Sequence, residues 1–135
     1  MREIIFRGKC IADGEWAYGD YYSSDEMPMR GEVGHFIKCG LNEEYMIIPE
    51  TIGQYTGLKD KNGKEIYEGD LCQRKYMKNG IEVIELYEVV YDVGMFTCEK
   101  IGARGLSSSL GYYCTNVKML IEVIGNKFEN PELIE

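Results

Sequence analysis

The densest group of side chains with potential chemistry is basic and aromatic, and it consists of Arg74, Lys75, Tyr76 and Lys78. An aromatic ring among cations is what single-stranded nucleic-acid binders use for base stacking and phosphate contact. The cluster falls on an expected strand, where it would lie on a barrel face or in a loop. The other interpretation is a solvated edge strand that its charges protect against pairing. A net charge of −8 repels phosphate backbones, so the edge-strand interpretation is favoured.

A second candidate is His35, the single histidine, with Cys39 four residues later. The pair suggests a metal site or a Cys-His nucleophile, but in a strand these residues would lie about 13 Å apart. We therefore expect a structural or surface histidine.

The cysteines are odd in number, scattered and without a C-x-x-C pair, which predicts reduced, mostly buried thiols and neither a metal site nor a cofactor. They are Cys10, Cys39, Cys72, Cys98 and Cys114.

Asp60 and Asp70 could serve as paired carboxylates for acid–base chemistry or a cation. Both, however, stand where a turn uses an aspartate to accept its own backbone N–H groups. Nothing in the chain resembles a Walker loop, a dinucleotide fingerprint or a serine nucleophile motif. We therefore expect no catalytic residues and a protein that is not an enzyme. The eleven tyrosines suit protein interfaces and half-buried strands equally well.

The most specific stretch runs from Thr51 to Asp70. Its Asn62-Gly63 pair predicts a type I′ hairpin turn, because both residues tolerate positive φ. Gly69 and Asp70 predict a second turn, with the Asp70 carboxylate accepting a nearby backbone N–H.

This stretch, with Gly53–Asp60 and Ile66–Leu71 as its two halves, resembles the hallmark of the YopX family, small proteins of phage and prophage origin. The opening Arg2–Gly8 and the closing Glu122–Leu133 are similar to the ends of that family. The resemblance implies an all-β chain of two small parts, the second an SH3-like barrel, and a homo-oligomer. It implies no known activity and no site residues.

The elements expected from the residues agree with an all-β fold. Short apolar or alternating runs are separated by Gly, Asn and Asp turn signals, which is typical of small barrels or sandwiches. A single helical turn is expected at 49–51, a loop at 23–34, and an irregular insertion at 101–111 with room for a short helix. The apolar run at 81–91 mixes two periods, and its β-branched content favours a long, bent strand over a helix. The other expected strands cover 3–12, 15–22, 35–39, 44–48, 71–77, 95–100 and 118–124, and Asn79-Gly80 joins two of the runs.

The chain has 135 residues, enough for one ordinary domain or for two very small units that share a core, and we expect two units at 1–57 and 58–135. Composition is that of a folded protein, without a leader or the roughly 20 apolar residues of a membrane span, so we expect it in the cytoplasm of a bacterial host. The first function hypothesis is a non-enzymatic, homo-oligomeric interaction protein that binds a host or phage macromolecule. Its alternative is a nucleic-acid-binding module built on the Arg74–Lys78 cluster, and the third is an enzyme with a site between subunits.

Overall fold

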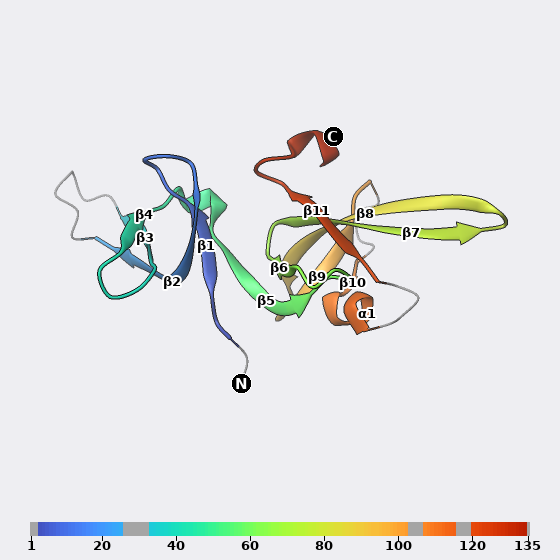
Figure 1. The fold of residues 1–135 in the computed structure, drawn as a ribbon, viewed down its shortest axis with the longest axis horizontal. Helices are drawn as coiled ribbons and strands as arrows, with labels where there is room; N and C mark the ends of the chain where they lie inside the picture. Colours follow the sequence, from blue (N-terminus) through green and yellow to red (C-terminus); the bar gives the residue numbers. More distant parts are fainter. Residues whose placement is uncertain (1–2, 26–32, 103–106, 116–119, 135) are drawn as a thin grey trace. The chain divides into compact units, whose positions relative to one another are not determined.

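The computed structural model describes residues 3–25, 33–102, 107–115 and 120–134 (Figure 1). It divides into two compact units, Met1–Tyr55 (unit 1) and Thr56–Glu135 (unit 2). Strands dominate both units, and all the strand pairs of the described residues are antiparallel. The prediction of a mainly all-β protein is therefore confirmed.

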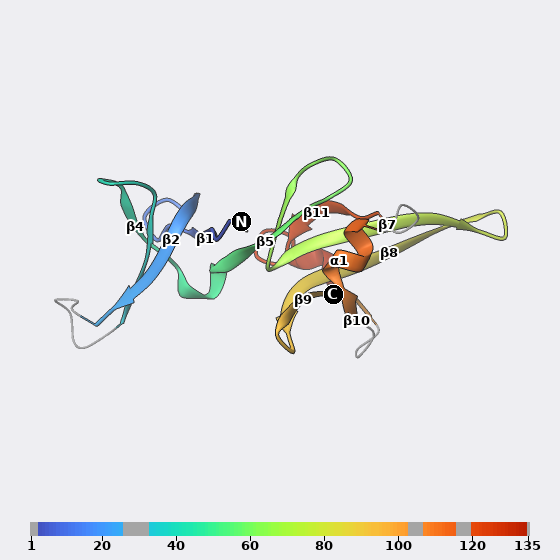
Figure 2. The same ribbon diagram turned by 90° about the horizontal axis from the view of Figure 1, so that it is seen from below.

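Unit 1 is a sheet in which consecutive strands pair with one another, in the order β4-β3-β2-β1. Figure 2 shows β4, β2 and β1 of this sheet. Its core contains Cys10, Ala17, Ile37 and Ile47, and an isolated bridge between Cys10 and Ile47 returns the chain after β4 to the end of β1. Its elements are β1 (Phe6–Lys9), β2 (Trp16–Ser24), β3 (Gly34–Lys38), β4 (Glu44–Met46), the short helix η1 (Pro49–Thr51) and the start of β5 (Gly53–Lys59).

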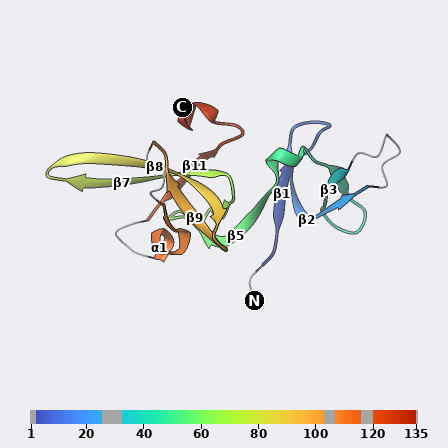
Figure 3. The ribbon, with the colours of Figure 1, turned by 180° about the vertical axis from the view of Figure 1, so that it is seen from behind.

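Unit 2 contains the end of β5, which leads into β6, and a five-stranded sheet in the order β10-β9-β8-β7-β11. Figure 3 shows β7, β8, β9 and β11 of this sheet from behind. The described strands of this sheet do not close into a barrel, so the SH3-like description of unit 2 stays a prediction. Its elements are β6 (Glu65–Tyr67), β7 (Asp70–Lys78), β8 (Ile81–Asp92), β9 (Met95–Lys100), β10 (Ser107–Ser109), α1 (Leu110–Thr115), β11 (Glu122–Asn126) and η3 (Pro131–Ile134).

The core of unit 2 is formed by inward-facing strand residues together with side chains of α1. Cys72 and Cys98 are fully buried in it as free thiols, and burial raises the pKa of Cys98 to about 12. Cys10 is likewise buried and free in unit 1, so the prediction of reduced thiols acting as small apolar side chains is confirmed for these three. The unit 2 core comprises Ile66, Cys72, Tyr87, Val89, Cys98, Leu110, Tyr113, Ile121 and Val123.

The type I′ prediction for Asn62-Gly63 is wrong. Gly63 has a φ of 81°, but Asn62 is not among the residues with positive φ. The Asp60 carboxylate instead accepts the N–H groups of Asn62 and Lys64, at 2.8 and 2.9 Å, and so stabilises a longer turn. Asp60 therefore acts through backbone hydrogen bonds, as predicted, but selects a different turn geometry.

Other local predictions are confirmed. Asp70 accepts the N–H of Tyr67 at 2.8 Å, and Gly69 has a φ of 93°. The run at 81–91 is a strand, and 49–51 is a helical turn.

The predicted loop at 23–34 is too long, because Ser23 and Ser24 belong to β2 and Gly34 begins β3, while 26–32 lie outside the described residues. In the predicted insertion, 103–106 lie outside the described residues, 107–109 form the strand β10 instead of irregular structure, and the short helix is α1. Within the described part of the chain, no helix is long and apolar enough to cross a membrane.

Candidate interaction surface at the β7–β8 ribbon

The feature of unit 2 with the greatest potential for binding is the outer part of the β7–β8 hairpin, which we call the arm and define as residues 74–85. Its strands pair continuously from Arg74 opposite Glu85 to Lys78 opposite Ile81. β11 pairs with β7 only up to Gln73, and β9 pairs with β8 from Tyr87 onward. Over the arm, therefore, β7 and β8 pair only with each other within the described residues. The ribbon extends past the neighbouring strands in Figure 1 and Figure 2.

The arm ends in a tight turn that its Asn79-Gly80 pair favours. Asn79 has a φ of 52° and Gly80 a φ of 78°, the two positive values that a type I′ turn requires. Such a turn matches the twist of the flanking strands and places residues at equal distances from it opposite one another. The Asn79-Gly80 pair thus sets the register of the whole arm.

Large apolar side chains are exposed on the arm. Met77, Ile81 and Ile84 are 65%, 68% and 51% exposed. Met77 and Ile84 share one face of the arm and Ile81 lies on the other, because Met77 pairs with Glu82 and Lys78 with Ile81. Isolated exposed apolar residues are ordinary, but Met77 and Ile84 together form a small apolar surface that suits a protein partner. Because a two-stranded ribbon alone is marginally stable in water, further contacts along it would stabilise the arm.

The base of the arm is held by a cluster around the Glu85 carboxylate. It accepts hydrogen bonds from the Arg74 guanidinium at 3.0 Å, from the Tyr76 hydroxyl at 2.7 Å and from the Tyr87 hydroxyl. The Lys100 ammonium on β9 lies 3.7 Å from it. The side chains of Arg74 and Glu85 are each only 12% exposed. We call these five residues the Glu85 cluster, and it links the arm to the core of unit 2.

The charge state of Glu85 follows from these contacts. Burial by itself would raise the pKa of Glu85, but hydrogen bonds from Tyr87 and Tyr76 and the charges of Arg74 and Lys100 outweigh it and lower the pKa. The hydrogen bond to Glu85 in turn raises the pKa of Tyr76. Burial, followed by the bond to Glu85, raises the pKa of Tyr87. The cluster is therefore a carboxylate surrounded by neutral and cationic donors.

The four residues of the nucleic-acid hypothesis all lie on the β7 strand of the arm, but the structure divides them. The Arg74 guanidinium stacks 4.4 Å from the centre of the Tyr76 ring, and both side chains are bonded to Glu85. Lys75 and Lys78 are exposed. Because strand residues alternate between faces, Lys75 faces the side opposite to Arg74, Tyr76 and Lys78. Binding of nucleic acid by this set stays a prediction.

The other residues considered for chemistry do not converge. His35 Nδ1 is hydrogen-bonded to the Tyr21 hydroxyl at 2.6 Å in unit 1. Within the part of the chain that the structure describes, no three His, Cys, Asp or Glu side chains are grouped to hold a metal ion. Asp60 adds a third backbone hydrogen bond, from the N–H of Val123 at 2.9 Å, and so joins its turn to β11.

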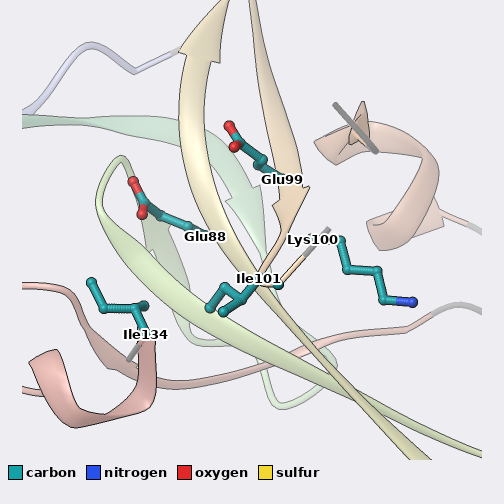
Figure 4. Close-up of a pocket in the computed structure, with 6 residues that line it drawn as sticks. Glu88, Glu99, Lys100, Ile101 and Ile134 are labelled. Atoms are coloured by element: carbon teal, nitrogen blue, oxygen red, sulfur yellow. The ribbon is translucent and has the colours of Figure 1, made fainter. Parts of the chain in front are cut away.

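A small pocket of about 240 Å³ also occurs in unit 2 (Figure 4). Glu88 and Glu99 face each other across β8 and β9 there, and Glu88 lies 3.7 Å from the Lys127 ammonium. The side chain of Lys100 points away from both glutamates. The volume is below the range of about 300–1,000 Å³ typical of ligand sites, so the arm is the stronger candidate. The pocket is lined by Glu88, Glu99, Lys100, Ile101, Gly102 and Ile134.

Sequence reasoning found the basic half of the arm and missed Glu85. A usable signal was present, because Arg74 and Glu85 stand at equal distances from the Asn79-Gly80 turn and a two-residue hairpin places such residues opposite each other. The participation of Lys100 on β9 carried no comparable signal.

The fold is thus that of a two-unit, mainly β protein whose most distinctive surface is a projecting ribbon. A family profile described as YopX protein matches residues 5–135. The chain belongs to the YopX family.

Comparison with solved structures gives a consistent result. The chain is similar to the crystal structure of protein EF1440 from Enterococcus faecalis, with 25% sequence identity, a TM-score of 0.59 and full coverage of both chains. No curated protein matches the chain.

Proposed function

We propose that the chain is a non-enzymatic interaction protein of phage or prophage origin that forms a homo-oligomer and binds a macromolecule of the bacterial host or the phage. A cytoplasmic location is part of this proposal. The single observation that carries it is the arm, a two-stranded ribbon with uncovered edges within the described residues and with exposed Met77, Ile81 and Ile84. Membership of the YopX family is consistent with it.

The base of the arm supports a role in binding. The Glu85 cluster bonds the two strands of the arm to each other and, through Tyr87 and Lys100, to the sheet. A surface held in one conformation before association loses less conformational entropy on binding than a flexible loop does. The arm therefore combines exposed apolar side chains with a fixed base.

Shortening the arm tests the proposal. Deleting Met77, Lys78, Ile81 and Glu82 removes two complete cross-strand pairs and leaves the Asn79-Gly80 turn joining Tyr76 to Val83. Because two residues are removed from each strand, every remaining side chain keeps its face. The matched control is Leu41→Ser, which removes a side chain that is 93% exposed in a turn of unit 1.

Molar mass is measured by light scattering across a range of protein concentrations. We expect a multiple of 15.5 kDa for the natural chain and for Leu41→Ser, and a smaller mass for the shortened arm. A natural chain that stays at 15.5 kDa at every concentration contradicts the proposed homo-oligomer. If the shortened chain has the same oligomeric mass as the natural chain, the arm is not part of the interface.

A further inference from the structure

The two edges of the arm are alike in geometry and different in charge. In an antiparallel ribbon each strand directs part of its backbone N–H and C=O groups toward its partner and the remainder outward. On β7 the outward edge is outside any strand pairing from Arg74 to Lys78, and on β8 from Ile81 to Glu85, within the described residues. Such edges are templates for pairing with another strand.

The β7 strand of the arm is basic and the β8 strand is acidic. Arg74 and Glu85 neutralise each other at the base. Beyond them, the β7 strand carries Lys75 and Lys78 and the β8 strand carries Glu82, and all three are exposed. The arm therefore presents one positive and one negative edge.

The charges distinguish between the possible ways in which two arms could pair. Joining two β7 edges would place lysines beside lysines, and joining two β8 edges would place glutamates beside glutamates, both of which are unfavourable in a sheet. Joining β8 of one copy to β7 of the next places opposite charges side by side. Lys75 and Glu82 also lie on the same face of the ribbon, because Lys75 pairs with Ile84 and Met77 pairs with Glu82.

We propose that the β8 edge of the arm pairs in antiparallel fashion with the β7 edge of the arm of a second copy of this chain. This inference rests on the proposed homo-oligomer and names the strands that form it. The strands would alternate β7-β8-β7-β8 across the interface, which continues the antiparallel order already present in each arm. Every two-stranded ribbon would gain a third strand, which is the number that gives a sheet independent stability.

The pairing has a consequence for assembly. It joins two different edges, so it is head to tail, and each copy keeps one edge available for the next copy. Such contacts generate closed rings when the rotation between copies closes and filaments when it does not. A dimer with a twofold axis is not a product of this contact.

Charge reversal tests the pairing. The first variant carries Lys75→Glu and Lys78→Glu, and the second carries Glu82→Lys. Each alone makes the two edges alike in charge, so we expect the dissociation constant to rise at least about tenfold in low salt. An equimolar mixture of the two variants brings oppositely charged edges together. The triple variant, which carries all three substitutions, does the same. In both cases the dissociation constant should lie within about threefold of that of the natural chain. The control is Lys38→Glu, an exposed lysine on β3 of unit 1, which should leave association unchanged.

Dissociation constants are measured by sedimentation velocity at two salt concentrations. The pairing is established if two results are obtained. Association is lost in each variant that changes the charge of one strand, and it recovers in the mixture and in the triple variant. If the natural chain is oligomeric and no charge variant changes its association, or if the triple variant does not recover, the head-to-tail pairing is wrong while the proposed homo-oligomer stands. A monomeric natural chain overturns both.

Discussion

The Glu85 cluster makes a quantitative prediction about stability. Replacing Glu85 with glutamine keeps the shape of the side chain and removes its charge. Tyr76, Tyr87 and Arg74 then face a neutral amide, whose NH₂ group cannot accept a hydrogen bond. Lys100 is about one-third exposed and its ion pair contributes little.

The size of the effect follows from the contacts that are lost. About two charge-assisted hydrogen bonds disappear, each contributing about 1.5 kcal/mol. We therefore expect Glu85→Gln to lower the free energy of unfolding at pH 7 by about 3 kcal/mol, similar to the loss of one partner of a buried ion pair, about 3–5 kcal/mol. Glu65→Gln on β6 is the control, because Glu65 is exposed and lies outside the arm, and it should change stability by less than about 0.5 kcal/mol.

Urea unfolding, followed by circular dichroism, measures both variants against the natural chain. A Glu85→Gln variant as stable as Glu65→Gln would refute the assignment of Glu85 as the charged centre of the cluster. The midpoint and the slope of each curve are both needed, because only a shift of the midpoint at constant slope reports stability alone.

The same prediction has a pH dependence. The pKa of Glu85 is lowered in the folded protein, so its stabilisation is fully present above the ordinary carboxyl pKa of about 4.3 and is lost as the pH falls through the lowered value. The difference between the natural chain and Glu85→Gln should therefore be largest at pH 7 and should shrink below about pH 4. A difference that grows on acidification would contradict this sign.

Three further predictions concern the rest of the chain. Asp60→Ala removes a carboxylate that accepts three backbone N–H groups and should lower unfolding free energy by about 2–4 kcal/mol, measured in urea with Asp60→Asn as the milder comparison. Gly8→Ala in unit 1 would direct a methyl group into the Ile47 side chain, and overpacking of this kind costs about 1–3 kcal/mol; a thermal midpoint equal to that of the natural chain would contradict it. Cys98 is buried and its pKa is raised to about 12, so a thiol reagent at pH 8 should label it rapidly only after unfolding. Peptide mass measurement locates the label, and fast labelling of Cys98 in the native protein would count against the described core.

The relation between the arm and the rest of unit 2 explains why a charge cluster, and not an apolar contact, lies at its base. Cys72 and Tyr87, which lie just outside the arm on the core-facing side of the ribbon, are buried. Beyond them, at the base of the arm, this side of the ribbon becomes exposed to solvent. A carboxylate with two tyrosine hydroxyls and a guanidinium suits such a boundary, because the Tyr87 ring packs in the core while its hydroxyl remains hydrogen-bonded. Polar contacts of the Glu85 cluster, and not apolar packing, therefore join the arm to the sheet.

Local features of this protein were determined by the sequence alone. The Asn79-Gly80 pair favours a type I′ turn and with it the register of the arm, because asparagine and glycine both tolerate positive φ. The β-branched content of 81–91 likewise favours a strand over a helix, as observed. The use of Asp70 in a turn was predictable for the same reason, since its hydrogen bond reaches only three residues back.

Tertiary structure alone decided the features that depend on residues far apart in the sequence. The turn at Asn62-Gly63 accommodates an Asp60 carboxylate that also binds the N–H of Val123, 63 residues later, and the local pair does not encode that contact. The Glu85 carboxylate likewise meets Lys100 only because β9 returns beside β8. Turn type and strand propensity are properties of a few neighbouring residues, whereas the environment of a buried charge depends on which strands the whole chain brings together.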